Sequence, residues 1–145
     1  MTISMQLVQT YKEVAFIMEI QYKIESSKDF SETIAALKES LSKEQFGVLW
    51  EMNFKDKLQE KGLDFETNFQ VMEACNPGKA KKVLDKNIEA GYFLPCKVVV
   101  YEKDQKIWMG MLKPTSLIGF LGEDALLEIA TEVETSLINA MENAK

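Results

Sequence analysis

The sequence predicts an α+β domain in which helices pack on one face of a largely antiparallel sheet. Apolar and polar residues alternate over 14–24, which is typical of a half-buried strand. Apolar residues recur at helical spacing over 30–41 and again over 126–141. The expected element order is β-α-β-α-β-α-β-β-α. A chain of 145 residues without a repeat or linker predicts a single domain, 1–145, with its core over about 12–142.

The first half of the chain is predicted to begin with a long strand over 14–24, followed by a helix. Asp29 with Glu32 three residues later is typical of a helix start. A second strand follows, in which apolar residues alternate. One face is expected to carry Gly47, Leu49 and Glu51, and the other Phe46, Val48, Trp50 and Met52. A short helix over 54–61 should end at Gly62, which suits the position after a helix.

In the second half, a strand over 69–74 is expected to lead into a helix that begins at Pro77, with Ile88 near the core. From Gly91 an extended run to Tyr101 is predicted, and Lys106 to Leu112 should return as the second arm of a hairpin. The last helix is expected over 123–142. Its apolar stripe comprises Leu126, Ile129, Val133, Leu137 and Met141.

The second face of the predicted sheet is not uniformly polar. Ile17, Leu49 and either Met109 or Trp108 are expected there. Exposed apolar positions of this kind are either scattered surface residues or part of a contact with a second subunit. Because two-fold dimers are the commonest oligomers, we predict a homodimer.

Composition excludes several classes of function. The net charge of −6 disfavours nucleic acid and anionic membrane surfaces as partners. The absence of histidine removes the usual general base and most zinc and haem sites, and two cysteines are too few for a metal cluster. We therefore predict no metal and no cofactor. Lys12 and Glu13 interrupt the only N-terminal apolar stretch, so no signal peptide is expected and a cytoplasmic protein with free thiols is predicted.

The segment Ala74-Cys75-Asn76-Pro77 is the first candidate site. Asn76 can cap a helix, and the helix N-terminus would stabilise a thiolate at Cys75 and lower its pKa, with Lys79 adding to the positive field. The competing interpretation is that Cys75 is a small buried apolar residue and that the lysines are solvated. Glu73 is expected on the face of Cys75, either desolvated or emerging into water.

The second candidate segment is Leu94-Pro95-Cys96. Cys96 alternates with Leu94 and Val98, a pattern typical of core packing. Pro95 cannot donate a ladder hydrogen bond, so it predicts an edge or a bulge, and bulges are common near functional sites. If the two strands are neighbours, Cys75 and Cys96 could form a reversible disulfide, which the sequence cannot establish. A copper site of methionine and cysteine is disfavoured because the methionines are scattered.

These motifs resemble the domain-of-unknown-function family 302. The resemblance rests on Phe46-Gly47-Val48-Leu49, the two cysteine segments in this order, and the run Val98-Val99-Val100-Tyr101-Glu102, with Pro114 after the last strand. It covers the chain from about Val14 onward. It implies a compact α+β fold similar to the arrangement of TATA-box-binding protein, often as a dimer, and no established reaction.

Three lysines depart from the pattern of that family. Lys81 stands where histidine is frequent, Lys97 where asparagine is common, and Lys113 where an acidic residue often precedes the proline. If those positions form a site in the family, that site is altered here, and a metal-binding role is disfavoured.

The sequence thus predicts a non-catalytic module that binds a small molecule or a protein and acts as a homodimer. Its expected site comprises Cys75, Asn76, Pro77, Lys79, Pro95 and Cys96. The alternative is a thiol-based redox or sulfur-handling enzyme with Cys75 as its nucleophile and Lys79 as an electrostatic helper. A third possibility is that the cysteine motif only supports the fold and that function resides in the dimer surface.

Overall fold

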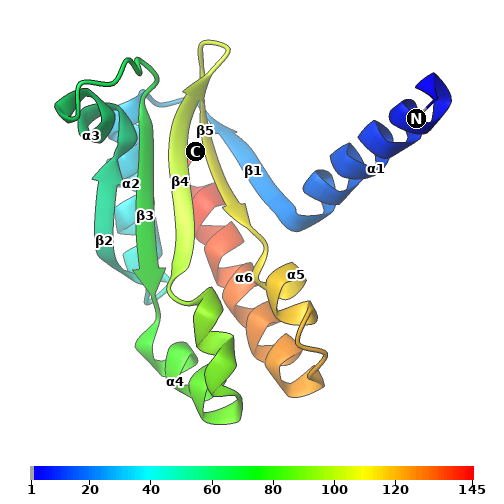
Figure 1. Cartoon of the computed structure of the whole chain (residues 1–145). Coiled ribbons are helices and arrows are strands. Elements are labelled where there is room, and N and C mark those ends of the chain that lie inside the picture. Colours follow the sequence, from blue (N-terminus) through cyan, green and yellow to red (C-terminus); the bar gives the residue numbers. More distant parts are fainter. Residues whose placement is uncertain (1) are drawn as a thin grey trace.

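A single five-stranded antiparallel sheet organises the molecule, with strand order β1-β5-β4-β3-β2 (Figure 1). The computed structural model describes residues 2–145, apart from the side chains of residues 16–18. The strands are β1 (Gln21–Ser26), β2 (Gly47–Asn53), β3 (Phe69–Cys75), β4 (Cys96–Lys103) and β5 (Lys106–Leu112). All four strand pairings are antiparallel, which confirms the predicted α+β class.

Two long helices, α2 (Phe30–Lys43) and α6 (Asp124–Ala144), cover one face of this sheet and contact each other (Figure 1). The other helical segments are α1 (Ile3–Ile20), α3 (Phe54–Glu60), α4 (Pro77–Lys86), the 3-10 helix η1 (Ile88–Phe93) and α5 (Pro114–Gly119). The core lies between the sheet and the two long helices. All five residues of the predicted α6 stripe are buried there.

Local signals in the sequence place several boundaries correctly. The Asp29 carboxylate accepts a hydrogen bond from the Glu32 backbone N–H at 2.8 Å, which caps α2. Gly62 follows α3 with a φ of 76°, a left-handed conformation that glycine adopts without strain. The predicted hairpin is confirmed, but β4 runs to Lys103, beyond the expected end at Tyr101, and only Asp104 and Gln105, both with positive φ, form the turn to β5.

The predicted strand over 14–24 is wrong in its first half, which is helical to Ile20. β1 pairs with β5 from Gln21 opposite Leu112 to Ser26 opposite Ile107. β5 cannot extend further, because Pro114 starts α5. Residues before Gln21 therefore have no strand to pair with. The helix-to-strand junction is fixed by the Lys113 backbone N–H, which donates to the Ile20 carbonyl at 2.7 Å. Ile17, expected on the second face, lies outside the described side chains.

A β-bulge between Val48 and Trp50 changes the predicted faces of β2. Val48 lies opposite Ala74, which is fully buried on the helix-covered side. Trp50 lies opposite Glu73, on the other side. The extra residue, Leu49, explains why one regular alternation did not describe the whole strand.

The stretch predicted as extended from Gly91 is also partly wrong. Residues 88–93 form η1, and β4 starts only at Cys96. Ile88 is 74% exposed rather than near the core. The short helix α5 was not predicted at all.

We call the sheet surface opposite α2 and α6 the open face. The register puts on it Gln21, Lys23, Glu25, Gly47, Trp50, Met52, Phe69, Val71, Glu73, Cys75, Lys97, Val99, Tyr101, Lys103, Lys106, Trp108, Gly110 and Leu112. α3 packs against it through Phe54, whose ring meets Phe69 edge-on at 5.7 Å, and Phe69 in turn stacks on Tyr101 at 5.6 Å. Trp108 is on this face, whereas Met109 is fully buried on the other.

Candidate functional site

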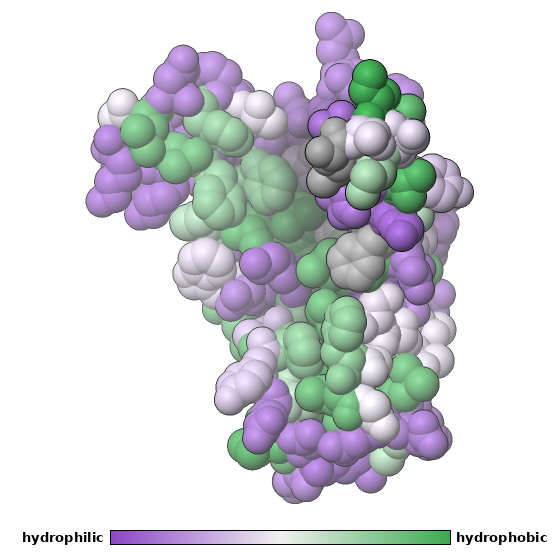
Figure 2. All heavy atoms as spheres, turned by 45° about the vertical axis from the view of Figure 1, so that its right-hand side comes forward, coloured by the Kyte–Doolittle hydropathy of each residue, from purple (hydrophilic) through white to green (hydrophobic). Residues whose placement is uncertain are grey.

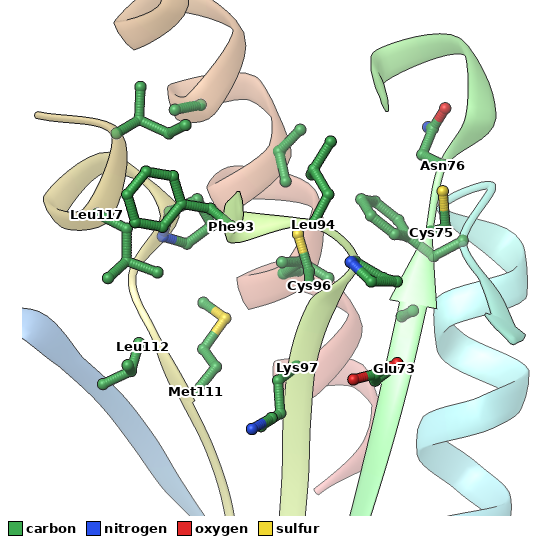
Figure 3. Close-up of a pocket in the computed structure, with 18 of the residues that line it drawn as sticks. Glu73, Cys75, Asn76, Phe93, Leu94, Cys96, Lys97, Met111, Leu112 and Leu117 are labelled. Carbon is green, nitrogen blue, oxygen red and sulfur yellow. The ribbon is translucent and has the colours of Figure 1, made fainter. Parts of the chain in front are cut away.

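A cavity of about 560 Å³ lies at the end of the sheet where β3 stops and β4 starts. Its walls come from that end of β3, β4, β5 and β1, and from α4, η1, α5 and α6. Most of the side chains that line it are apolar. Five of the six candidate residues line this cavity, namely Cys75, Asn76, Lys79, Pro95 and Cys96, and Pro77 does not. Two segments about twenty residues apart in the sequence therefore meet around one space (Figure 3).

The turn after β3 is built as the sequence indicates. β3 ends at Cys75, and the Asn76 side-chain oxygen accepts a hydrogen bond from the Lys79 backbone N–H at 3.2 Å. Pro77 occupies the first turn of α4, where its missing N–H costs nothing. Asn76 and Pro77 therefore have a structural role. They hold Cys75, which is half-buried, between the strand end and the start of α4.

Lys79 is not free to act on Cys75. Its ammonium group forms an ion pair with the Glu132 carboxylate of α6. The Lys79 hydrogen bond and charge lower the pKa of Glu132, which is exposed. Lys79 thus ties α4 to α6 beside the cavity, which disfavours its predicted role as an electrostatic helper of the thiol.

Cys96 lies on the helix-covered face of β4, opposite Ala74 of β3. Burial raises the pKa of the Cys96 thiol to about 11, and the nearby Cys75 contributes in the same direction. Cys96 is therefore protonated at neutral pH. Both cysteines are free, and the register does not pair them directly across the two strands.

Pro95 directly precedes β4 and is not within a ladder. Of the predicted edge or bulge at Pro95, the edge is wrong, because β4 lies between β3 and β5. A proline just before the first residue of a central strand removes no ladder hydrogen bond. In this position it forms part of the cavity wall.

The sequence interpretation missed much of the apolar wall. Tyr92 and Phe93 come from η1, Leu94 follows it, and Leu117 comes from α5. Figure 3 shows Phe93, Leu94 and Leu117 around Cys96, with Leu112 and Met111 below them on β5. Two signals could have found these elements. Asn87 caps η1 through a hydrogen bond from the Glu89 N–H at 2.9 Å, and Pro114 sits in the first turn of α5.

Charged groups lie where the cavity reaches the open face. Glu73 and Lys97 are opposite each other on β3 and β4, and both line the cavity (Figure 3). Lys23 also lines it and holds its ammonium group 4.7 Å from the centre of the Trp108 ring. Across residues 2–145, no three histidine, cysteine, aspartate or glutamate side chains are grouped so as to hold a metal ion.

Comparison with known families agrees with the motifs around this cavity. Residues 22–144 match the family described as "Domain of unknown function DUF302". The chain belongs to this family. A solved structure, the crystal structure of an uncharacterized conserved DUF302 protein from Bacillus stearothermophilus, is 45% identical and superposes with a TM-score of 0.84. That match covers 87% of this chain and 98% of the other. No curated protein matches the chain.

Membership of the DUF302 family confirms the resemblance found in the sequence and assigns no reaction. Helix α1 precedes the matched residues 22–144, so the family match does not extend to it. The likeness to TATA-box-binding protein and the homodimer stay predictions. Among the described helices, none has the length and apolar character needed to cross a membrane.

Proposed function

We propose that this DUF302 protein is a non-catalytic binding module that holds a small, largely apolar molecule in the cavity at the β3–β4 end of the sheet. The observation that carries this proposal is the cavity itself. At about 560 Å³ it falls within the range of small-molecule sites, which are typically apolar with a few polar groups.

The distribution of polarity suggests how a ligand would lie. Phe93, Leu94 and Leu117 provide an apolar wall at the helical end. Lys23 and Lys97 lie at the open-face end, where their ammonium groups would face a polar or anionic group of the ligand. We therefore favour an apolar body with a polar or acidic end.

Titration with 1-anilinonaphthalene-8-sulfonate, an apolar probe with an anionic group, tests this proposal. The wild-type protein is expected to bind the probe saturably at one site. Replacing Leu117 with tryptophan should weaken that binding by about tenfold or more, because the larger ring occupies the space of the ligand.

Leu127→Trp is the matched control, since Leu127 is a helical leucine, 41% exposed, that does not line the cavity. Its affinity for the probe should equal that of the wild type. Equal probe binding by wild type and Leu117→Trp, with both proteins folded by circular dichroism, would place the probe elsewhere and contradict the proposal.

The alternative, a thiol enzyme that uses Cys75, is favoured by one observation, since Cys75 lines the cavity beside the N-terminus of α4. Two observations disfavour it. Lys79 is paired with Glu132, so its charge is not available to the Cys75 thiol. Cys96 is held protonated, so it supplies no second thiolate at neutral pH. A binding role therefore fits the surroundings of the thiols better.

A further inference from the structure

Helix α1 exposes a broad apolar surface. Ile3, Leu7, Tyr11 and Val14 follow one another at helical spacing, and each is at least half exposed. Val8 lies beside the stripe and is also more than half exposed, and Met5, equally exposed, lies on the opposite side of the helix. Most of the stability of a protein helix comes from packing of its apolar face, so the 18-residue α1 is expected to pack against a surface.

The open face is a second uncovered apolar surface on the same chain. Trp50 and Leu112 are each about half exposed on this face, at 48% and 49%. Trp50 lies towards one edge of the sheet and Leu112 towards the other. Phe69, Tyr101 and Trp108 lie between them. Figure 2 shows hydrophobic residues on the floor of a hollow between α3 and the projecting α1.

α1 cannot cover the open face of its own chain. The helix ends at Ile20 and β1 begins at Gln21, so no loop residue is available to turn the helix back. The hydrogen bond from the Lys113 N–H to the Ile20 carbonyl fixes that junction. Figure 1 shows the result, with α1 pointing away from the sheet.

We infer that the occupant of the open face is α1 of a second copy of this chain, and that the two copies exchange these helices. Each chain carries both halves of the contact, so a two-fold arrangement satisfies both pairs at once. Charge also fits. α1 carries Glu13 and Glu19 against Lys12, whereas the open face carries four lysines (Lys23, Lys97, Lys103 and Lys106) against Glu25 and Glu73.

The expected area is sufficient for a stable dimer. An 18-residue helix is roughly 27 Å long and about 10 Å wide, so half of its lateral surface is on the order of 400 Å². Each copy buries one helix surface and one sheet surface, or roughly 800 Å² per copy, which is the standard size of a specific interface. Open-face residues such as Lys23, Lys97 and Leu112 also line the cavity, so the exchanged helix would cover its mouth, but helix exchange does not require a bound ligand.

Sedimentation equilibrium of the full chain and two kinds of variant tests the exchange. The wild type is expected at twice the chain mass of 16.5 kDa. One variant, Leu7→Glu with Tyr11→Lys, removes the stripe while adding a favourable ion pair one turn apart, so the helix itself is preserved. The other, Trp50→Lys, alters the open face opposite Glu73. Each variant alone should be monomeric, and Leu127→Lys on the exposed surface of α6 should stay dimeric.

Mixing the two monomeric variants distinguishes helix exchange from other dimers. A mixed dimer places the intact α1 of the Trp50→Lys chain on the intact open face of the other chain and restores one of the two contacts, so dimers should reappear with weaker affinity, at higher protein concentration than the wild type needs. A sheet-to-sheet dimer would ignore the α1 variant, and a helix-to-helix dimer would ignore Trp50→Lys. A monomeric wild type, a dimeric α1 or Trp50 variant, or a mixture that stays monomeric would each overturn the inference. If Trp50→Lys loses its native circular dichroism, Leu112→Lys replaces it in the same test, since it alters the other side of the open face.

Discussion

Replacing Leu37 with alanine is expected to lower the free energy of unfolding by about 2–5 kcal/mol. Leu37 has no exposed surface and projects from α2 into the core between the two long helices and the sheet. Removing most of its side chain loses buried apolar area and leaves a void that close-packed neighbours cannot fill. Of the variants considered, this one should destabilise the protein most.

Urea denaturation of wild type and Leu37→Ala gives the difference directly. Leu127→Ala, which truncates a partly exposed leucine of α6, is the matched control and should change stability far less. Since Leu37 does not line the cavity, a folded Leu37→Ala protein should still bind the apolar probe. Equal losses for the two leucine variants would show that α2 is not packed as described.

Cys96 is expected to react with iodoacetamide about 100-fold more slowly in the native protein than after denaturation. Its pKa is raised from 9.0 to about 11, mainly by burial, so the reactive thiolate is scarcer by roughly that factor at neutral pH. Mass spectrometry of peptides from samples quenched at successive times measures the rate. The rate should rise with pH up to about 11. A native rate equal to the denatured rate would contradict the buried position of Cys96.

The same raised pKa predicts how Cys96 links stability to pH. Below pH 9.0, the pKa of the thiol in the unfolded state, Cys96 is protonated in both states and stability does not depend on its titration. Between 9.0 and about 11 only the unfolded state releases the proton, so stability falls with rising pH, on the order of 2 kcal/mol over that window. Cys96→Ala should lose less stability over the same pH range than the wild type does.

The fold was predictable where local chemistry decides it. The Asp29 cap, the α6 stripe and the hairpin of β4 and β5 each depend on residues close in the sequence. The helical α1 was not predictable in this way, because residues 14–20 alternate like a strand. What decides their structure is the length of β5. This strand ends at Leu112, so the residues before Gln21 have no strand to pair with. The bulge at Leu49 likewise depends on the pairing with β3.

The candidate site was predictable only in part. The two cysteine segments stand out in the sequence, and β3 and β4 are neighbours that bring them to one cavity. The predicted role of Lys79 as an electrostatic helper required an unpaired ammonium group. Its partner Glu132 lies on α6, more than fifty residues away in the sequence, so local patterns do not reveal the ion pair. The apolar wall of η1 and α5 comes from short elements whose periodicity is too brief to detect.

The most direct test of ligand binding in the cavity is a titration of methyl-labelled protein with 1-anilinonaphthalene-8-sulfonate, followed by NMR. Our account predicts that the methyl signals of Leu94, Met111 and Leu117, which line the cavity, shift together and saturate with one dissociation constant. The methyl signals of Leu63 and Leu127, which do not line it, should stay in place. Shifts confined to Leu63 or Leu127, or no saturable shift at the cavity methyls, would contradict the account.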